Sequence, residues 1–340
     1  MDGRLVETAE DVSQLAFGFM ASKALFAALH VDVFTVLADG PKTSAQIAEK
    51  TGIPTNRITT LMTALTSVGL VDRSDDEIYT NSPGAAAFLS RGAKYDFGDY
   101  LRYQIDRQMY PFLQQLNEVM DGSLDPDAVD SYQHWMADPK QAAIYSEAQH
   151  AGSLGPGKTL ARLVDLKGAK TLLDIAGGTG AMTIRLLEAN PEMTATIIDF
   201  PNVSELGWRF ITEAGMVDRV RYIPGNALQI AWPTEQDAIL MSYLFSGIPG
   251  GELPRMVSDA FDSLAPGGRF MVHDFMVDDD RQGPPMAALW QLQHMAFTPD
   301  ARSVTPGWLI ARMEEVGFTD IQEHEMVPGL TRLIVGTKPG

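Results

Sequence analysis

The chain has 340 residues, of which 45% are apolar and 21% charged, a composition typical of a globular protein with a full core and enough length for two domains. Its 26 basic and 44 acidic residues give a formal net charge of −18, which argues against a nucleic-acid partner because a phosphate backbone needs clustered Lys and Arg. The absence of cysteine excludes disulfides, thiolate metal sites and a cysteine nucleophile, and we predict no metal site.

The N-terminal region predicts a long buried helix. Residues 11–38 carry apolar side chains at helical spacing and also on the other faces, as in a helix covered by a second subunit. Residues 1–4 lack the basic, apolar character of a secretory signal, and charged or titratable residues such as Lys23 and His30 interrupt the apolar stretch too early for a membrane span. We therefore expect a cytoplasmic protein with no membrane partner.

Residues 43–81 predict two short helices followed by a hairpin. The second helix, over 55–68, ends at Gly69, and the hairpin has a polar tip. This order is a winged-helix arrangement, which serves either DNA binding or dimerisation. The second helix offers only Arg57 as a cation, and the tip is acidic, so phosphates would be repelled. We predict an all-α winged-helix dimerisation domain over residues 1–95.

Residues 96–165 predict a helical connector rich in amphipathic aromatic side chains. Such a layer beside a ligand-binding domain is a plausible pocket wall. A cluster of glycine and proline predicts a break before the helix that enters the next domain. The aromatic residues are Tyr100, Tyr103, Tyr110, Tyr132, Trp135 and Tyr145, and the cluster is Gly152, Gly155, Pro156 and Gly157.

Residues 166–340 alternate between strand and helix patterns. This alternation predicts a mostly parallel α/β sheet, a Rossmann-like domain with helices on both faces. The last two strands are separated by Pro328-Gly329 and are expected to form an antiparallel hairpin at the edge. The predicted strands are 172–175, 195–199, 220–223, 238–244, 269–275, 321–326 and 333–338, with helices that include 254–264 and 306–316.

The stretch 172–180, Leu-Leu-Asp-Ile-Ala-Gly-Gly-Thr-Gly, is the strongest chemical signal. A strand, a glycine turn and a helix in succession present backbone N–H groups to a nucleotide-like ligand. The second strand ends at Asp199, about twenty residues on, where a carboxylate can accept both hydroxyls of a ribose. The third strand is followed by Asn226, whose amide is expected to read an adenine edge, and the fourth ends at Ser242. These elements together predict a nucleoside ligand.

The identity of that ligand follows from charge. The turn lacks the Gly-Lys-Ser/Thr of a phosphate-binding P-loop. Asp174 would repel a pyrophosphate but can hold the amino group of a methionine moiety, which favours S-adenosylmethionine over NAD. The predicted cofactor-binding residues are Asp174, Gly177, Gly178, Gly180, Asp199, Phe200, Gly225, Asn226, Ala227 and Ser242.

Four motifs, 173–180, 199–203, 264–268 and 317–318, resemble those of the small-molecule methyltransferases related to plant caffeate O-methyltransferases. With the N-terminal module, the resemblance covers nearly the whole chain. It implies an S-adenosylmethionine-dependent methyltransferase with a small-molecule acceptor. It also implies a homodimer whose N-terminal modules interlock and partly close the partner's pocket.

The chain departs from that family where the catalytic base is expected. The family's His-Asp pair corresponds to the stretch Ser246-Gly247-Ile248-Pro249, in which no residue is a base near neutral pH. The family's acid on the fifth strand is retained as Asp274, beside His273. Ala176 replaces the usual first glycine of the turn, and other family positions differ as well, with Asn226 in place of Asp and Ser242 in place of Lys.

Two enzymatic hypotheses account for the missing base. In the first, the acceptor is a thioether, which needs no deprotonation. In its missing base and in its length, the chain is similar to the bacterial S-methyltransferases that act on 4-methylthio-2-hydroxybutyrate in dimethylsulfoniopropionate synthesis. In the second, it is an O- or C-methyltransferase of an aromatic or tetrapyrrole metabolite, with a base relocated to His273, Asp274 or His294. The chain also resembles the bacteriochlorophyllide C-methyltransferases, which share a His near His294 and a loop like residues 38–42, Ala-Asp-Gly-Pro-Lys. A winged-helix regulator that senses S-adenosylmethionine is the non-enzymatic alternative.

The remaining site predictions concern the acceptor. Arg102 and Arg107 are considered as anchors for a substrate carboxylate, but exposed arginines without that role are the favoured interpretation. The predicted catalytic residues are His273, Asp274 and Tyr145, and the predicted substrate-binding residues are Tyr145, Gln149, His150, Phe245, Gln291 and His294.

Overall fold

The computed structural model describes residues 5–124 and 132–340. Residues 1–4 and 125–131, which belong to the predicted first domain and connector, lie outside the described residues. The described chain forms two compact units, one ending at Tyr110 and the other beginning at Pro111. The division into 1–95, 96–165 and 166–340 stays a prediction.

The N-terminal unit is mainly helical with a small antiparallel sheet, ordered β1-β3-β2. The predicted order of two helices and a hairpin is present as α3, α4, β2 and β3, and the short strand β1 is added to it. The helices are α1 (Ala9–His30), α2 (Val33–Ala38), α3 (Ser44–Thr51), α4 (Thr55–Ser67), α5 (Pro83–Phe88) and a π-helix (Tyr100–Met109), and the strands are β1 (Lys42–Thr43), β2 (Val71–Arg73) and β3 (Ile78–Asn81).

The predicted single helix over 11–38 is in fact two helices. Asp32 has a φ of 54° in the left-handed region, so the chain turns between α1 and α2. The buried guanidinium of Arg102 donates to the carbonyl of Leu29 at 2.9 and 2.7 Å, which satisfies the end of α1. Arg102 is therefore structural, and its consideration as a carboxylate anchor is not supported.

Helix α1 leaves much of its apolar surface uncovered within this unit. Val12, Leu15, Phe17, Phe19 and Met20 are each 50–58% exposed. Among the helices of the described residues, α1 is the one long and apolar enough to cross a membrane by length and composition alone. A helix covered by another protein surface meets the same criteria.

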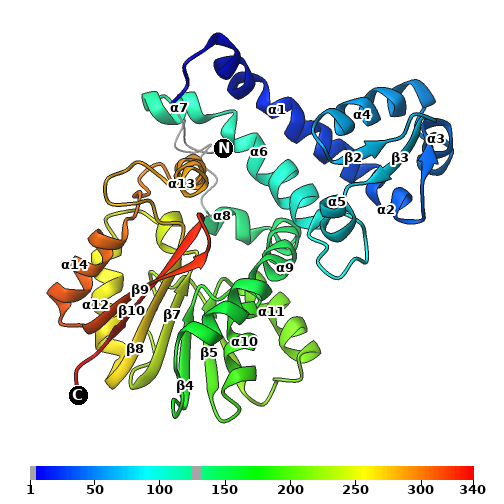
Figure 1. The fold of residues 1–340 in the computed structure, drawn as a ribbon. Helices are drawn as coiled ribbons and strands as arrows, with labels where there is room; N and C mark the ends of the chain where they lie inside the picture. Colours follow the sequence, from blue (N-terminus) through cyan, green and yellow to red (C-terminus); the bar gives the residue numbers. More distant parts are fainter. Residues whose placement is uncertain (1–4, 125–131) are drawn as a thin grey trace. The chain divides into compact units, whose positions relative to one another are not determined.

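The C-terminal unit holds a seven-stranded sheet in the order β6-β5-β4-β7-β8-β10-β9 (Figure 1). The predicted α/β class is confirmed: β10 is antiparallel to both neighbours, and the other pairings are parallel. The strands are β4 (Thr171–Ile175), β5 (Thr194–Asp199), β6 (Val220–Pro224), β7 (Gln236–Ser242), β8 (Leu264–Asp274), β9 (Thr319–Val327) and β10 (Thr331–Thr337).

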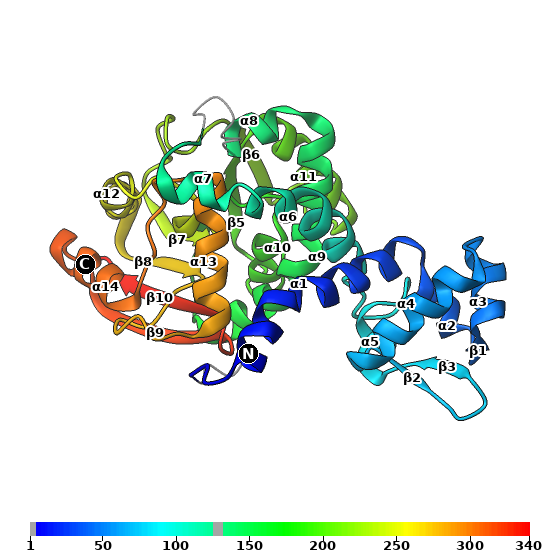
Figure 2. The same cartoon turned by 90° about the horizontal axis from the view of Figure 1, so that it is seen from above.

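Helices cover both faces of this sheet (Figures 1 and 2). Side chains alternate along β4, so Leu172 packs toward α9, α10 and α11 while Leu173 packs toward α12 and α14. Both leucines are fully buried, as expected for a parallel strand covered on two sides. The helices described in this unit are α7 (Leu116–Asp121), α8 (Tyr132–Ala137), α9 (Pro139–Leu163), α10 (Ala181–Ala189), α11 (Pro201–Glu213), α12 (Leu253–Ser263), α13 (Pro285–Phe297) and α14 (Pro306–Val316), with a 3-10 turn at Phe245–Gly247. Helix α6 (Tyr110–Leu113) begins at the last residue of the N-terminal unit.

The predicted helix break at 152–157 is wrong, because α9 runs continuously through Pro156. Gly157 serves the contact with α10 instead. A Cβ on Gly157 would lie 3.3 Å from Cα of Met182, so glycine allows the two helices to approach closely. Packing of α9 along its length outweighs the local preference of glycine and proline for a turn.

Candidate active site

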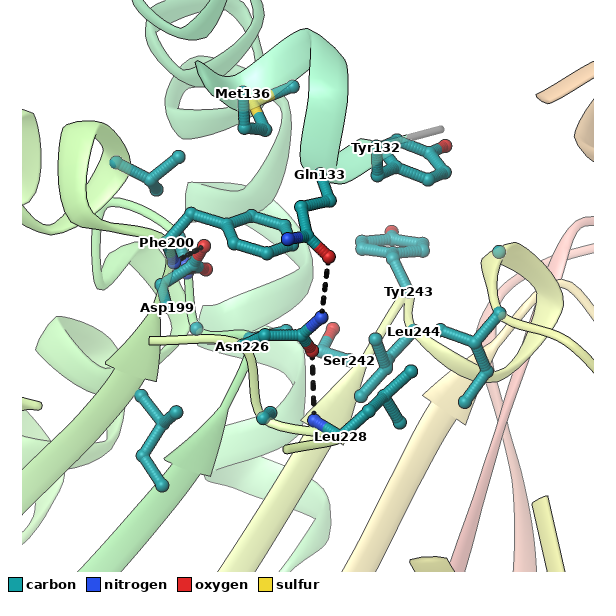
Figure 3. A pocket seen from close by; sticks show the side chains of 18 of the residues that line it. Tyr132, Gln133, Met136, Asp199, Phe200, Asn226, Leu228, Ser242, Tyr243 and Leu244 are labelled. Carbon is teal, nitrogen blue, oxygen red and sulfur yellow. Dashed lines mark hydrogen bonds between the residues drawn. The ribbon is translucent and has the colours of Figure 1, made fainter. Parts of the chain in front are cut away.

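A cavity of about 580 Å³ opens at the carboxyl ends of the parallel strands. Figure 3 shows side chains from the ends of β5, β6 and β7 on one side and from α8 on the other. Of the predicted cofactor residues, nine line the cavity: Asp174, Gly177, Gly178, Asp199, Phe200, Gly225, Asn226, Ala227 and Ser242.

The glycine turn is shaped by backbone that only small residues tolerate well. Ala176, Gly178 and Gly180 have φ values of 56°, 59° and 78°. A Cβ on Gly177 would lie 2.5 Å from Cγ of Asp174, so this position requires glycine. Gly180 does not line the cavity. A Cβ there would lie 2.9 Å from Ile211, so Gly180 begins α10 against the core, and its prediction as a cofactor contact is corrected.

Asp174 lines the cavity and keeps one oxygen without a hydrogen-bond partner. Its Oδ2 accepts from the hydroxyl of Thr183 at 2.6 Å, while its buried Oδ1 has no hydrogen-bond partner. Burial raises the pKa of Asp174 to about 7. An unpartnered buried acceptor is costly and marks a place where a donor belongs, such as an amino group.

Asp199 is held rigidly at the end of β5. Its two oxygens accept from the backbone N–H groups of Gly178 and Phe200, each at 2.7 Å. Burial raises the pKa of Asp199 to about 6, although these two hydrogen bonds oppose the rise. Each carboxylate oxygen retains acceptor capacity, so the pair can still receive two ribose hydroxyls.

Asn226 lies at the predicted position, but its amide already has protein partners. The amide nitrogen donates to Oε1 of Gln133 at 3.0 Å, and Oδ1 accepts from the backbone of Leu228 at 2.9 Å (Figure 3). Gln133 comes from α8 and was not predicted. Both side chains line the cavity, so their pairing shapes its wall.

Ser246, at the position where the resembling family has its base, makes buried hydrogen bonds with Asp274. The hydroxyl of Ser246 donates to Oδ1 of Asp274 at 2.6 Å, and its backbone N–H donates to Oδ2 at 3.1 Å. Asp274 is fully buried and does not line the cavity, and burial raises its pKa to about 6. The structure therefore does not support Asp274 as a catalytic residue, because its carboxylate holds the turn at Phe245–Gly247 in place.

His273 is also behind the cavity wall. Its Nδ1 lies 2.9 Å from the hydroxyl of Ser242, and its Nε2 lies 2.9 Å from that of Thr331. Burial lowers the pKa of His273 to about 3. Both ring nitrogens are occupied and the ring is neutral, so its prediction as a catalytic base is not supported. Of the three side chains linked by these hydrogen bonds, Ser242 is the one that lines the cavity.

Aromatic rings form part of the cavity wall. Tyr145 and Gln149 line the cavity as predicted, and burial raises the pKa of Tyr145 to about 12. Tyr132 stacks on Phe297 with centroids 5.3 Å apart, and both line the cavity together with Tyr243. The sequence marks Tyr132 only as an aromatic residue of the connector, and it carries no signal for Phe297 beyond its place near His294.

The other four predicted substrate-binding residues do not line the cavity. His150 contacts Thr179 instead, at 2.7 Å from Nδ1 to the hydroxyl. Gln291 donates to backbone carbonyls at 2.5 and 3.0 Å, and Phe245 is fully buried in the core. His294 is buried behind Tyr132, with Nδ1 3.4 Å from its hydroxyl and Nε2 unpartnered, and burial lowers its pKa to about 4.

The charged side chains that the structure describes in the cavity lining are all acidic. Within the described residues, Asp174, Asp199, Glu252 and Asp300 line the cavity, whereas Lys, Arg and His do not. The same part of the chain shows no group of three His, Asp or Glu side chains that could hold a metal ion. A cationic sulfonium ligand with an amino group is compatible with this lining, and the unpartnered Oδ1 of Asp174 fits that amino group.

Comparison with known proteins agrees with these features. A model of the O-methyltransferase dimerisation domain matches residues 13–91, and a model of the O-methyltransferase domain matches residues 127–318. The tetracenomycin polyketide synthesis 8-O-methyl transferase of Streptomyces glaucescens is 27% identical over 330 residues, covering 97% of this chain and 96% of that protein.

Solved structures share the fold over the full length. A protein of Nostoc punctiforme described as an O-methyltransferase matches with a TM-score of 0.88 and 21% identity, over 98% of this chain and 100% of the other. Human N-acetylserotonin methyltransferase in complex with S-adenosylmethionine matches with a TM-score of 0.85 and 19% identity, over 100% of both chains.

Proposed function

The chain belongs to the O-methyltransferase family and is an S-adenosylmethionine-dependent enzyme, and from this premise we propose that it methylates a hydroxyl group of a small aromatic metabolite. The observation that carries the proposal is the aromatic wall of Tyr132, Tyr145 and Phe297, which suits a flat ring. The Streptomyces relative is named for O-methylation in polyketide synthesis, which favours the same acceptor class.

The residues at the cofactor end act by binding and orientation. When bound, S-adenosylmethionine supplies an electrophilic methyl group on sulfur. In the proposed site the unpartnered oxygen of Asp174 would accept a hydrogen bond from its amino group, and Asp199 would accept from the ribose hydroxyls. The carboxylates also favour its positive charge. Catalysis then rests on holding the acceptor oxygen in line with the methyl group.

Of the three predicted bases, His294 is the one that can accept the proton of the acceptor hydroxyl. His273 and Asp274 are separated from the cavity, but His294 lies 3.4 Å from the hydroxyl of Tyr132, which lines it. In this proposal the Tyr132 hydroxyl accepts the proton of the acceptor hydroxyl and passes its own proton to Nδ1 of His294. Because burial lowers the pKa of His294, an acceptor with an acidic hydroxyl suits the site best.

The proposal is tested by supplying labelled S-adenosylmethionine with matched candidate acceptors: a naphthol, a catechol, a thioether acid and an aromatic amine. We expect label in a methyl ether of a ring hydroxyl. Label recovered in a sulfonium or amine product would contradict the acceptor class while leaving the cofactor assignment intact.

A thioether acceptor is the second candidate function, and Ser246 at the base position favours it. A neutral sulfur nucleophile needs no base, and the carboxylate lining suits a sulfonium product. The predicted acceptor, 4-methylthio-2-hydroxybutyrate, finds no support among the relatives. The His294→Ala variant discriminates at neutral pH, where the wild-type imidazole is unprotonated and able to act as a base. With a thioether acceptor the rate at saturating cofactor should match the wild type, whereas with a hydroxyl acceptor it should fall.

We also propose a homodimer formed through the N-terminal unit. The family model for dimerisation covers residues 13–91, which include the exposed apolar residues Leu15, Phe17, Phe19 and Met20 of α1. The winged-helix arrangement serves dimerisation in this proposal, and the cytoplasmic location stays a prediction.

A further inference from the structure

The glycine turn is bound by side chains from three separate elements. Asp199 of β5 accepts from the N–H of Gly178 at 2.7 Å, and the hydroxyl of Tyr222 on β6 donates to the carbonyl of Gly178 at 3.1 Å. Nδ1 of His150 on α9 lies 2.7 Å from the hydroxyl of Thr179. Of the three, only Asp199 lines the cavity, so His150 and Tyr222 act on the turn from behind.

His150 is itself fixed in position. Its ring stacks on Phe210 of α11, with centroids 3.8 Å apart and planes 22° apart. Burial, with Arg185 and Arg209 nearby, lowers the pKa of His150 to about 4. The imidazole is therefore neutral at neutral pH, and its contact with Thr179 is a hydrogen bond between neutral groups.

Tyr222 reaches the turn because α11 makes room for it. A Cβ on Gly207 would lie 2.1 Å from the hydroxyl oxygen of Tyr222, so glycine is required there. The ring packs edge-on against Trp208 with centroids 5.4 Å apart. The Tyr222 hydroxyl thus occupies a slot between α11 and the carbonyl that it binds.

The turn needs such support because its backbone is strained. Ala176 has a φ of 56°, a conformation that alanine adopts only at a cost. Left-handed backbone persists where surrounding structure holds it, and a ligand site held before binding loses less entropy when the ligand arrives.

We propose that His150 and Tyr222 are positioning residues that hold the glycine turn in its cofactor-binding form. The proposal rests on this turn binding S-adenosylmethionine and is independent of which acceptor is methylated. It assigns His150 to the cofactor side of the site.

The test measures binding of S-adenosylhomocysteine by calorimetry. His150→Phe keeps a ring against Phe210 but removes the hydrogen bond, and we expect Kd to rise about three- to tenfold. His150→Asn, which restores a polar atom near Nδ1, should recover most of that affinity. At saturating cofactor kcat should stay within about twofold, because the loss lies in binding. The same substitution at His324, on the edge strand β9, is the matched control.

A second variant guards against a folding defect. Tyr222→Phe removes only the hydroxyl, and because Tyr222 does not line the cavity, a several-fold rise in Kd reports on the turn. Combining His150→Phe with Thr179→Val should weaken binding no more than the stronger single change. An unchanged Kd in His150→Phe and Tyr222→Phe, additive effects in the double variant, or a fall in kcat alone would each overturn the proposal. A failed acceptor screen would leave it untouched.

Discussion

The two cofactor carboxylates differ in how they are satisfied, and this difference determines what a ligand gains from each. Asp199 has two backbone donors, whereas Asp174 keeps one buried oxygen without any. The sequence predicted both residues because each follows a strand in the order that a nucleoside site requires. It could not show that His273 and Asp274, adjacent to the same edge, turn their side chains into the protein.

We expect cofactor affinity to depend on pH through these carboxylates. The pKa of Asp174 is about 7 and that of Asp199 about 6, so a proton occupies them as pH falls. A ligand amino group binds the ionised form and competes with that proton. The Kd of S-adenosylhomocysteine should therefore fall as pH rises from 5.5 to 7, by about tenfold per unit well below the pKa.

Calorimetry across this range tests the dependence, with Asp174→Asn as the comparison. The variant cannot be protonated at this position, so its weaker binding should change less with pH. A wild-type Kd that is constant from pH 5.5 to 7 would show that neither carboxylate titrates against the ligand.

Removing the second carboxylate tests the ribose assignment. Asp199→Ala should weaken S-adenosylmethionine binding at least about tenfold, because hydrogen bonds to a charged group contribute roughly 1.5–3 kcal/mol. Asp218→Ala, at an exposed position on the same unit, should bind like the wild type. Equal affinity of Asp199→Ala and wild type would place the cofactor elsewhere.

At the scale of elements, alternation of strand and helix patterns gave the sheet and the helix at Pro306–Val316 correctly. The continuity of α9 could not be predicted, because the local signal of its glycines and proline points to a turn. What outweighs that signal is contact with α10, visible at Gly157. The aromatic wall was similarly out of reach, since it joins α8, α9 and α13 across more than a hundred residues.

The packing of α11 on β6 yields a stability prediction. Gly207→Ala would place a Cβ 2.1 Å from the Tyr222 hydroxyl, and displacing that ring should cost about 1–3 kcal/mol. Because Tyr222 holds Gly178, cofactor affinity should fall as well. Denaturant unfolding and calorimetry measure the two effects.

Gly152→Ala is the control for this substitution. Gly152 is an exposed glycine inside α9 with no atom within 4 Å of a built Cβ, so alanine there should leave stability unchanged or raise it by up to about 1 kcal/mol. Equal stability of the two variants would mean that α11 and β6 relax freely around Tyr222.

For the whole molecule, the exposed apolar residues of α1 are the strongest sign that one copy is incomplete. Phe17 and Phe19 are 58% and 50% exposed on a helix that the dimerisation-domain match includes. The sequence predicted a helix apolar on all faces and hence a covering subunit. The bend at Asp32 escaped prediction, because it depends on Arg102, seventy residues away.

We expect the protein to sediment at twice its chain mass, and Phe17→Glu with Phe19→Glu to shift it toward the monomer, because two charges would be buried in the proposed interface. Val217→Glu, at an apolar position of the C-terminal unit that is 47% exposed, should remain dimeric. Co-flotation of the wild type with lipid vesicles would instead assign α1 to a membrane.

Because α9 is continuous, one helix contacts both the acceptor side and the cofactor side of the proposed site. Along about one and a half turns it presents Tyr145 and Gln149 to the cavity and His150 to the glycine turn. A displacement of α9 that strengthens its contacts with the acceptor would also change its contact with the glycine turn, which lies on the cofactor side. Thermodynamic linkage makes that influence reciprocal: the factor by which a bound acceptor changes the affinity for the methyl donor equals the factor by which the donor changes the affinity for the acceptor. In the proposed site a single helix therefore couples the affinities for the two substrates.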